Sequence, residues 1–190
     1  MASTPEYFGT EKADVVTRDA IAPGTFWSHY YGNGGDDNIT WLNGQVIGGP
    51  GNDTIIRPLG DSVTSVYAAY WTSPKGVYVD LEAGYALDGF GTRDTLVNIN
   101  CISDSGNNDT IYGSSGDDWI NTGNGQDYID GRAGVDTVNM DGPASAWKIS
   151  VSVDGRITKL VRIDNPNNRS SELHNIEWLN FNFSIHKFLC

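Results

Sequence analysis

The sequence predicts an all-β fold in which short parallel strands stack in right-handed coils to form a solenoid. Three observations support this prediction. Residues 104–139 divide into four consecutive nine-residue units, DSGNNDTIY, GSSGDDWIN, TGNGQDYID and GRAGVDTVN. Each unit has aspartate in its sixth place and an aliphatic residue in its eighth place. The fourth place holds glycine in three units and Asn107 in the first, and both residue types tolerate positive φ.

Each unit reads as a turn of about six residues followed by a strand of three. Alternation along such a strand sends only the eighth residue inward, so a single unit cannot bury enough apolar surface to fold alone. Two units form one coil, and successive coils stack roughly 4.8 Å apart. Neighbours on the same side are therefore two units apart. We expect Asp109 to lie over Asp127, and Asp118 over Asp136.

Facing aspartates need a counter-charge. Two carboxylates held this close repel each other, and their pKa values rise unless a cation lies between them. The glycine-rich turns also bend so that backbone carbonyl oxygens point inward. About six hard oxygen donors suit calcium, whereas magnesium demands a tighter octahedron and keeps its water. The sequence therefore predicts several Ca²⁺ ions.

Residues Gly48–Ile56, GGPGNDTII, match the repeat G-G-x-G-x-D-x-U-x at every fixed place. With five clear repeats in register, the chain resembles the RTX, or haemolysin-type, calcium-binding module, whose fold is a parallel β-roll. The resemblance implies that sixth-place aspartates bind calcium through their side chains and early turn residues through their carbonyls. The implied aspartate ligands are Asp37, Asp53, Asp109, Asp118, Asp127 and Asp136. The implied turn ligands are Gly32, Gly35, Gly48, Gly49, Gly51, Asn107, Gly113, Gly116, Thr122, Gly123, Gly125, Gly131 and Gly134. The unit 104–112 departs from the pattern, because its first, second and fourth places are not glycine.

Composition agrees with a fold held by bound ions. The 190 residues are 38% hydrophobic and include 23 glycines, which is lean for a globular core. The net charge of −12 argues against nucleic acid or an anionic membrane as partner, and for cations. The first residues lack the features of a signal peptide, and no stretch is long enough to insert into a membrane. The resemblance implies a secreted, extracellular bacterial protein exported by a type I secretion apparatus.

The chain divides into five expected segments. Residues 1–31 form a degenerate first coil and an aromatic insert, 32–56 a first repeat block, 57–103 interrupted β coils without a metal motif, 104–139 a second repeat block, and 140–190 a β cap. In the first coil, Gly9–Thr17 places Asp14 and Val16 in the sixth and eighth places. Residues 40–46, TWLNGQV, read as a shortened half-coil. Asp37 and Asp53 therefore stay on one side, and a calcium site is predicted between their turns.

The segments outside the repeats carry strand patterns. Residues 62–70 and 76–81 are expected to continue the stack, with a linker between two short rolls as the alternative. In the cap, 148–153 and 156–163 predict a hairpin, and 176–183 predicts a further strand. Trp147 and Trp178 are expected in the core of the cap. The aromatic residues of 18–31 either close the open end of the stack or form a ligand-stacking loop.

Catalysis is not expected. None of the three histidines has H-E-x-x-H spacing, and neither a G-x-S-x-G elbow nor a phosphate-binding loop is present. Cys101 and Cys190 are expected to be free thiols. We therefore predict a module that folds on Ca²⁺ binding outside the cell and acts as a folding and secretion device and scaffold of a secreted protein.

Two alternatives stay open. The first is a carbohydrate- or surface-binding module of adhesin or lectin type that binds extracellular polysaccharide. The second is a non-catalytic module trimmed from a secreted enzyme. Residues in the seventh and ninth places face outward, so exposed aromatic rings could stack on sugars. The candidate ligand-facing aromatics are Trp119, Tyr112, Tyr128 and Trp27.

Overall fold

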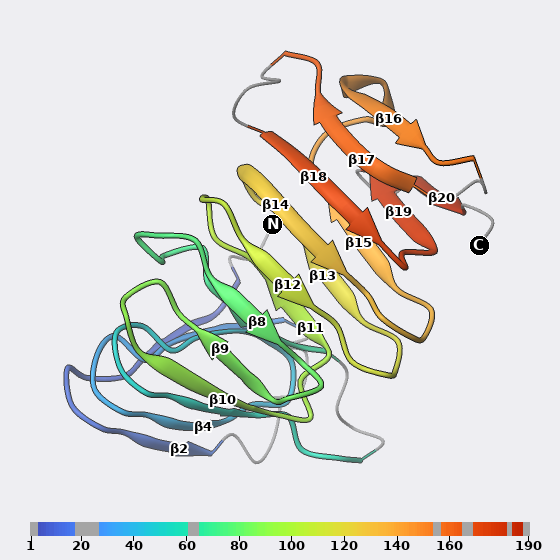
Figure 1. Cartoon of the computed structure of the whole chain (residues 1–190). Coiled ribbons are helices and arrows are strands. Elements are labelled where there is room, and N and C mark those ends of the chain that lie inside the picture. Colours follow the sequence, from blue (N-terminus) through green and yellow to red (C-terminus); the bar gives the residue numbers. More distant parts are fainter. Residues whose placement is uncertain are drawn as a thin grey trace.

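The computed structural model describes residues 4–17, 27–60, 65–153, 157–164, 169–181 and 184–187. Two β-sheets face each other across a narrow core (Figure 1). Sheet A contains, in spatial order, β1 (Glu6–Phe8), β3 (His29–Tyr31), β5 (Gly44–Ile47), β7 (Val66–Ala69), β11 (Cys101–Ser103), β13 (Trp119–Asn121), β15 (Thr137–Met140), β19 (Trp178–Phe181) and β20 (Ser184–Lys187). Sheet B contains, in spatial order, β16 (Trp147–Val151), β17 (Ile157–Arg162), β18 (Arg169–His174), β14 (Gly125–Asp130), β12 (Thr110–Tyr112), β8 (Tyr78–Asp80), β9 (Tyr85–Leu87), β10 (Arg93–Val97), β6 (Thr54–Ile56), β4 (Asn38–Thr40) and β2 (Val15–Thr17).

In the repeat blocks the chain crosses between the sheets after every strand, which makes the fold a parallel β-roll. The second block confirms the nine-residue phase, because Ile111 pairs with Ile129 in sheet B and Ile120 pairs with Val138 in sheet A. These four side chains are fully buried. Each three-residue strand thus contributes its middle side chain to the core, as the alternation along the strand requires.

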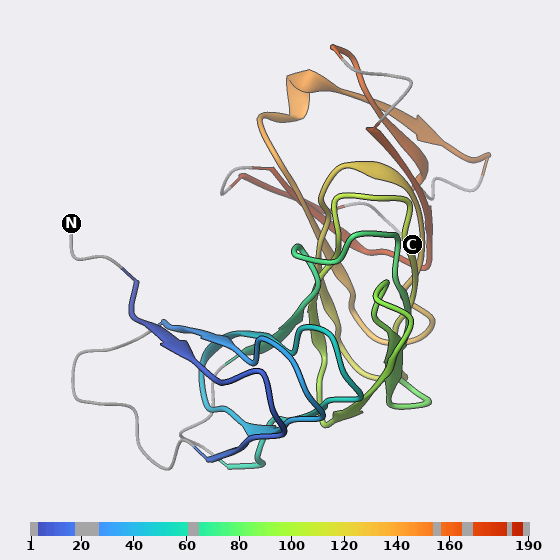
Figure 2. The same cartoon turned by 90° about the vertical axis from the view of Figure 1, so that its left-hand side faces the viewer.

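The segment between the blocks carries the sheets through without a break, but it is not built only of parallel coils. In sheet A, only β7 lies between β5 and β11. In sheet B, β10, β9 and β8 fill the matching interval between β6 and β12, and β9 is antiparallel to both of its neighbours. Sheet B is therefore wider by two strands at this level. Figure 2 shows the roll bending here, with the wider sheet B on the outside of the bend.

The first coil is present as predicted from Gly9–Thr17, since β2 stacks in parallel on β4. Tyr30 and Trp41 are buried inside this end of the roll, and the ring of Tyr7 packs edge-on against Trp41 at 5.5 Å. Of the described aromatic residues in 18–31, Tyr30 therefore enters the core, whereas Tyr7 and Trp41 lie outside that segment and Trp27 is exposed. Residues 18–26 of the insert lie outside the described residues.

The cap extends both sheets. The predicted hairpin is confirmed by the antiparallel pairing of β16 with β17, and the predicted strand at 176–183 contains β19. The sequence patterns did not predict β18, which pairs in parallel with β14. Trp147 is 4% exposed, as expected. The prediction for Trp178 was wrong: it is only partly buried, because Leu179 and Phe181 are the residues of β19 that face inward.

Candidate metal centres

The sixth-place aspartates form ladders at the corners of the roll, just before the strands. In each predicted pair, the carboxylate of the later aspartate accepts a hydrogen bond from the backbone N–H of the earlier one. The N–H of Asp109 donates to Asp127 Oδ1 at 3.2 Å, and the N–H of Asp118 donates to Asp136 Oδ1 at 2.8 Å. In the first block, the N–H of Asp37 donates to Asp53 Oδ1 at 2.9 Å. All three predicted pairs therefore lie face to face.

These hydrogen bonds use only one oxygen of each accepting carboxylate. The Oδ2 atoms of Asp37, Asp53 and Asp136 are buried and have no hydrogen-bond partner. The three residues are at most 2% exposed. A buried carboxylate oxygen without a donor carries a large desolvation cost, so each of these atoms calls for a cation or a proton.

Backbone carbonyls crowd the same spaces. A Cβ atom added at Gly48 would collide with Asp53 Oδ2, one at Gly49 with the carbonyl oxygen of Asn33, and one at Gly51 with that of Gly35. Gly49 and Gly51 also have φ values of +96° and +150°. Glycine is therefore required both by the backbone conformation and by the oxygen atoms that line the corner.

The predicted turn residues gather at three such corners. Before β4 and β6 lie Gly32, Gly35, Gly48, Gly49 and Gly51. At β12 and β14 lie Asn107, Thr122, Gly123 and Gly125. Before β13 and β15 lie Gly113, Gly116, Gly131 and Gly134.

Burial disfavours charge on the corner aspartates. Burial, with a smaller contribution from the facing carboxylate in each pair, raises the pKa of Asp53, Asp127 and Asp136 to about 7. Burial likewise raises the pKa of Asp37 and Asp118. Hydrogen bonds from backbone N–H groups act in the opposite direction and are outweighed. Hard anionic oxygens beside neutral carbonyl oxygens are the donor set that calcium prefers, so these corners fit Ca²⁺.

Asp94 extends the first ladder, although the sequence patterns assigned no repeat to its segment. Asp94 Oδ1 accepts the N–H of Asp53 at 3.0 Å, and Asp94 Oδ2 accepts the hydroxyl of Tyr70 at 3.1 Å. Burial raises the pKa of Asp94 to about 8. The nine residues from Gly89 to Val97, GFGTRDTLV, hold aspartate and leucine in the sixth and eighth places. That phase was the signal that could have found Asp94.

Two further acids join the corners of the second block. Glu177 Oε2 accepts the N–H of Asp136 at 2.7 Å, so it occupies the next step of the ladder before β19. Asp104 lies at the first place of its unit, where glycine is usual. Its carboxylate forms a buried group with Asp109 and Asp127, in which one oxygen from each residue lies within 4.8 Å of the others. In the sequence, only the presence of an acidic residue at the first place of this unit indicated that Asp104 could join the corner.

The candidate ligand-facing aromatics do not share one surface. Tyr112 and Tyr128 belong to sheet B, whereas Trp119 belongs to sheet A and Trp27 packs against Tyr67 of that sheet. A continuous aromatic surface is therefore excluded for this set. The physical reason is that successive nine-residue units enter opposite sheets.

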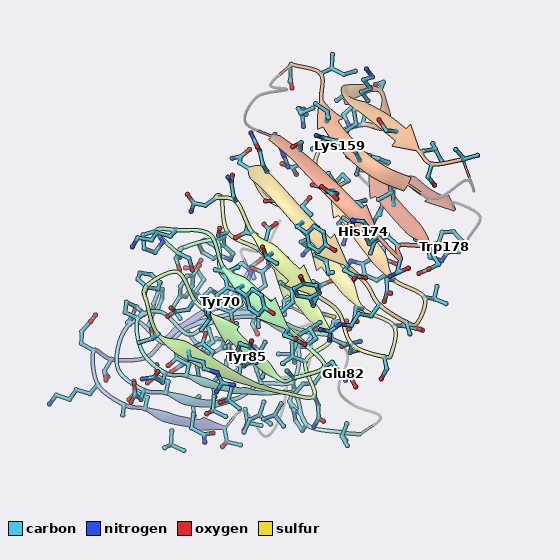
Figure 3. The ribbon with its side chains drawn as sticks, in the orientation of Figure 1. Tyr70, Glu82, Tyr85, Lys159, His174 and Trp178 are labelled. Carbon is cyan, nitrogen blue, oxygen red and sulfur yellow. The ribbon has the colours of Figure 1, made fainter. Side chains whose placement is uncertain are left out.

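Tyr112 and Tyr128 instead belong to a row of aromatic rings in mutual contact along sheet B. Neighbouring ring centroids in this row are 5.0 to 5.9 Å apart. The row runs in the order Tyr85, Tyr78, Tyr112, Tyr128 and His174, and Figure 3 shows its two end residues on the outer face of sheet B. Each inner ring is flanked by the next ring on both sides. The contacts between these rings therefore reduce the ring surface that is available to stack on a sugar.

A parallel β-roll with buried acidic corners defines the class of calcium-binding repeat proteins. Residues 41–56 and 104–138 match the family model for the RTX calcium-binding nonapeptide repeat, in four copies. The chain therefore carries RTX calcium-binding repeats, whose family binds calcium and is typically extracellular. No curated protein matches the chain. The described residues include no helix with the length and apolarity needed to cross a bilayer.

Proposed function

We propose that this chain is a non-catalytic calcium-binding β-roll module that folds when it meets calcium outside the cell. In this role it is the folding and secretion device and the scaffold of a secreted bacterial protein. The observation that carries the proposal is the set of buried, unpartnered Oδ2 atoms on Asp37, Asp53 and Asp136. An apolar core alone does not compensate for three such atoms.

The architecture explains why the bound ion decides the folded state. Each repeat strand contributes one middle side chain to the core, while the corners bring carboxylates together at every level. Calcium, when bound, supplies two positive charges between the facing carboxylates. Without that charge, Asp37 and Asp53 repel each other in a space closed to water. Binding free energy then becomes folding free energy.

This coupling suits export through a type I apparatus. Cytosolic calcium is far below the Kd of extracellular calcium modules, which is about 10⁻⁴–10⁻³ M, so the chain stays unfolded while it is threaded. Outside the cell, each corner is shared by two coils. Asp136, for example, is hydrogen-bonded both to Asp118 and to Glu177. Ordering one corner therefore places an aspartate of the next, and we expect folding to be cooperative.

Circular dichroism with and without calcium tests the proposal. We expect a β-rich spectrum in millimolar CaCl₂ and loss of most of its amplitude in EDTA, with MgCl₂ unable to restore it. Asp53→Asn and Asp136→Asn should each raise the calcium concentration at the folding midpoint. The matched control is Asp36→Asn, because Asp36 is exposed and lies in the same turn as Asp37. An equally strong β spectrum in EDTA would refute calcium-triggered folding.

A second candidate function is contact with extracellular polysaccharide at Trp119. Its ring borders a hollow of about 270 Å³ whose lining also includes Arg57, Asn100 and Asp117. An aromatic ring beside several hydrogen-bonding groups is typical of sugar sites. Trp119→Ala should abolish binding on a glycan array while leaving calcium-induced folding intact. If the wild-type chain binds no glycan on such an array, this candidate is excluded.

A further inference from the structure

The corner at β12 and β14 differs from the others in its number of acids. Asp104, Asp109 and Asp127 each direct a carboxylate oxygen into one space, and all three residues are at most 4% exposed. Elsewhere in the described parts of the chain, no three histidine, cysteine, aspartate or glutamate side chains come as close together. The third acid comes from the first place of the unit, which is glycine or threonine in the other three units of the block.

Asp104 is oriented for a ligand rather than for a structural bond alone. Its Oδ1 accepts the N–H of Gly123, which fixes the side chain in the corner. Its Oδ2 is buried and has no partner. Asp109, in contrast, is engaged by the N–H of Val77 and by Ser105. The free oxygen of Asp104 is therefore the atom that the corner leaves unsatisfied.

Neutral oxygens complete the surroundings of this group. A Cβ added at Gly123 would collide with the carbonyl oxygen of Ser105, and one added at Gly125 would collide with that of Asn107. Both carbonyls therefore border the same narrow turns. A surface hollow of about 280 Å³ reaches Asp109 and Asp127 from outside, which gives an ion a route to the corner.

The charge balance points to one divalent cation. Arg169, which is 8% exposed, interacts electrostatically with both Asp104 and Asp127. Three carboxylates and one guanidinium leave two negative charges in this buried region. Calcium affinity rises with the number of charged ligands and with the rigidity of the site. A corner with a third, fixed carboxylate should therefore bind more tightly than a corner with two.

We propose that Asp104, Asp109 and Asp127 together form a three-carboxylate calcium site that is the tightest in the chain and the first to fill. The proposal rests on the calcium-binding function above and adds which corner binds calcium first. Asp127 lies in β14, between β12 and the cap strand β18, so filling this site orders the second block and positions the cap against it.

Calcium titration calorimetry on the full chain tests this order of filling. Asp104→Asn removes the charge but keeps an oxygen for the Gly123 N–H, and Asp104→Thr introduces the residue that Thr122 already supplies at the first place of its unit. We expect the tightest equivalent of the wild type to weaken by about tenfold or more in both variants. The control Asp117→Asn makes the same charge change at an exposed position and should leave it unchanged.

The outcomes separate this proposal from the function on which it rests. If the wild type binds no calcium, the proposed function itself fails. If the wild type binds calcium and both Asp104 variants keep the tightest equivalent, only the leading role of this corner is overturned.

Should both variants fail to fold in saturating calcium, terbium competition on the wild type decides. One Tb³⁺ equivalent should displace calcium ahead of all others, because the extra charge of a trivalent ion gains most at the corner with the most carboxylates. Uniform displacement would contradict the proposal.

Discussion

The backbone N–H of Asp53 donates to Asp94 Oδ1 at 3.0 Å, across 41 residues of intervening chain. β10 thus stacks directly on β6, and β7, β8 and β9 are accommodated without interrupting the first ladder. The nine-residue unit Gly89–Val97 therefore supplies the last aspartate of the first ladder. The hydroxyl of Tyr70 donates to the second oxygen of that aspartate, Asp94 Oδ2. Four predictions test the corners and the sheet that carries them.

Asp94→Ala should destabilise the calcium-loaded protein by about 1–3 kcal/mol, because it leaves the buried N–H of Asp53 and the hydroxyl of Tyr70 without an acceptor. Urea unfolding in saturating calcium measures the loss. Asp164→Ala, at an exposed aspartate that pairs with Arg162, is the control and should change stability little. Equal midpoints for Asp94→Ala and the wild type would show that Asp94 is not part of the ladder.

Gly125→Ala should destabilise the fold by about 1–3 kcal/mol, because Gly125 has a φ of +130° and the new Cβ would collide with the carbonyl oxygen of Asn107. Gly106→Ala is the matched control in the same block, since a Cβ there meets nothing within 4 Å. Thermal melts in calcium should separate the two variants clearly. Similar melting temperatures would mean that the turn at Gly125 can relax.

Acid should promote folding of the calcium-free chain. Asp53, Asp127 and Asp136 have pKa values of about 7 in the fold, well above the value near 4 of an aspartate in an unfolded chain. The folded state therefore binds more protons between these values. The resulting stability is fully present below pH 4 and is lost as the pH rises through 7.

The β-sheet circular dichroism amplitude of protein stripped of calcium on a chelating resin should thus be larger at pH 5 than at pH 8. The apparent calcium affinity should fall as the pH is lowered from 8 to 5, because protons and calcium compete for the same oxygens. Asp136→Asn removes one of these groups and should reduce the difference between the amplitudes at the two pH values. A calcium-free protein that is more stable at pH 8 than at pH 5 would be incompatible with the buried corners.

Tyr112→Ala should destabilise the protein by about 1–3 kcal/mol, because the ring of Tyr112 packs in a tilted arrangement against those of Tyr78 and Tyr128, each at 5.8 Å between centroids. The guanidinium of Arg132 also lies 5.2 Å from the ring centroid. Tyr112→Phe keeps the ring and should be nearly neutral in the same chemical denaturation experiment. If the alanine and phenylalanine variants are equally stable, the contacts between the aromatic rings do not stabilise sheet B.

Much of the second block could be predicted from the sequence because its interactions repeat at a fixed separation. Asp109 and Asp127 are 18 residues apart, as are Asp118 and Asp136, so the phase of the repeat alone places them together. The same phase predicts which aliphatic residue of each strand is buried. Glycine at the early turn places likewise predicts where backbone oxygens crowd.

Other features depend on contacts that no local phase encodes. Asp80 and Arg132 form an ion pair of 2.8 Å across 52 residues, which ties β8 to the second block. The placement of β8 beside β12, rather than beside β6, is what opens sheet B to β9 and β10. Asp104 joins the acidic corner of Asp109 and Asp127 only because its coil stacks on the one that contains Asp127.

The sequence by itself determined the nine-residue period, the stacking of three-residue strands in parallel coils and the acidic corners. Each of these follows from residue types that recur every nine positions. Only the tertiary structure decided the bend of the roll, the membership of Asp94 and Asp104 in the corners, and the separation of the exposed aromatics onto two sheets. These depend on which coils become neighbours in space, and an inserted hairpin changes that order while leaving the repeats on either side intact.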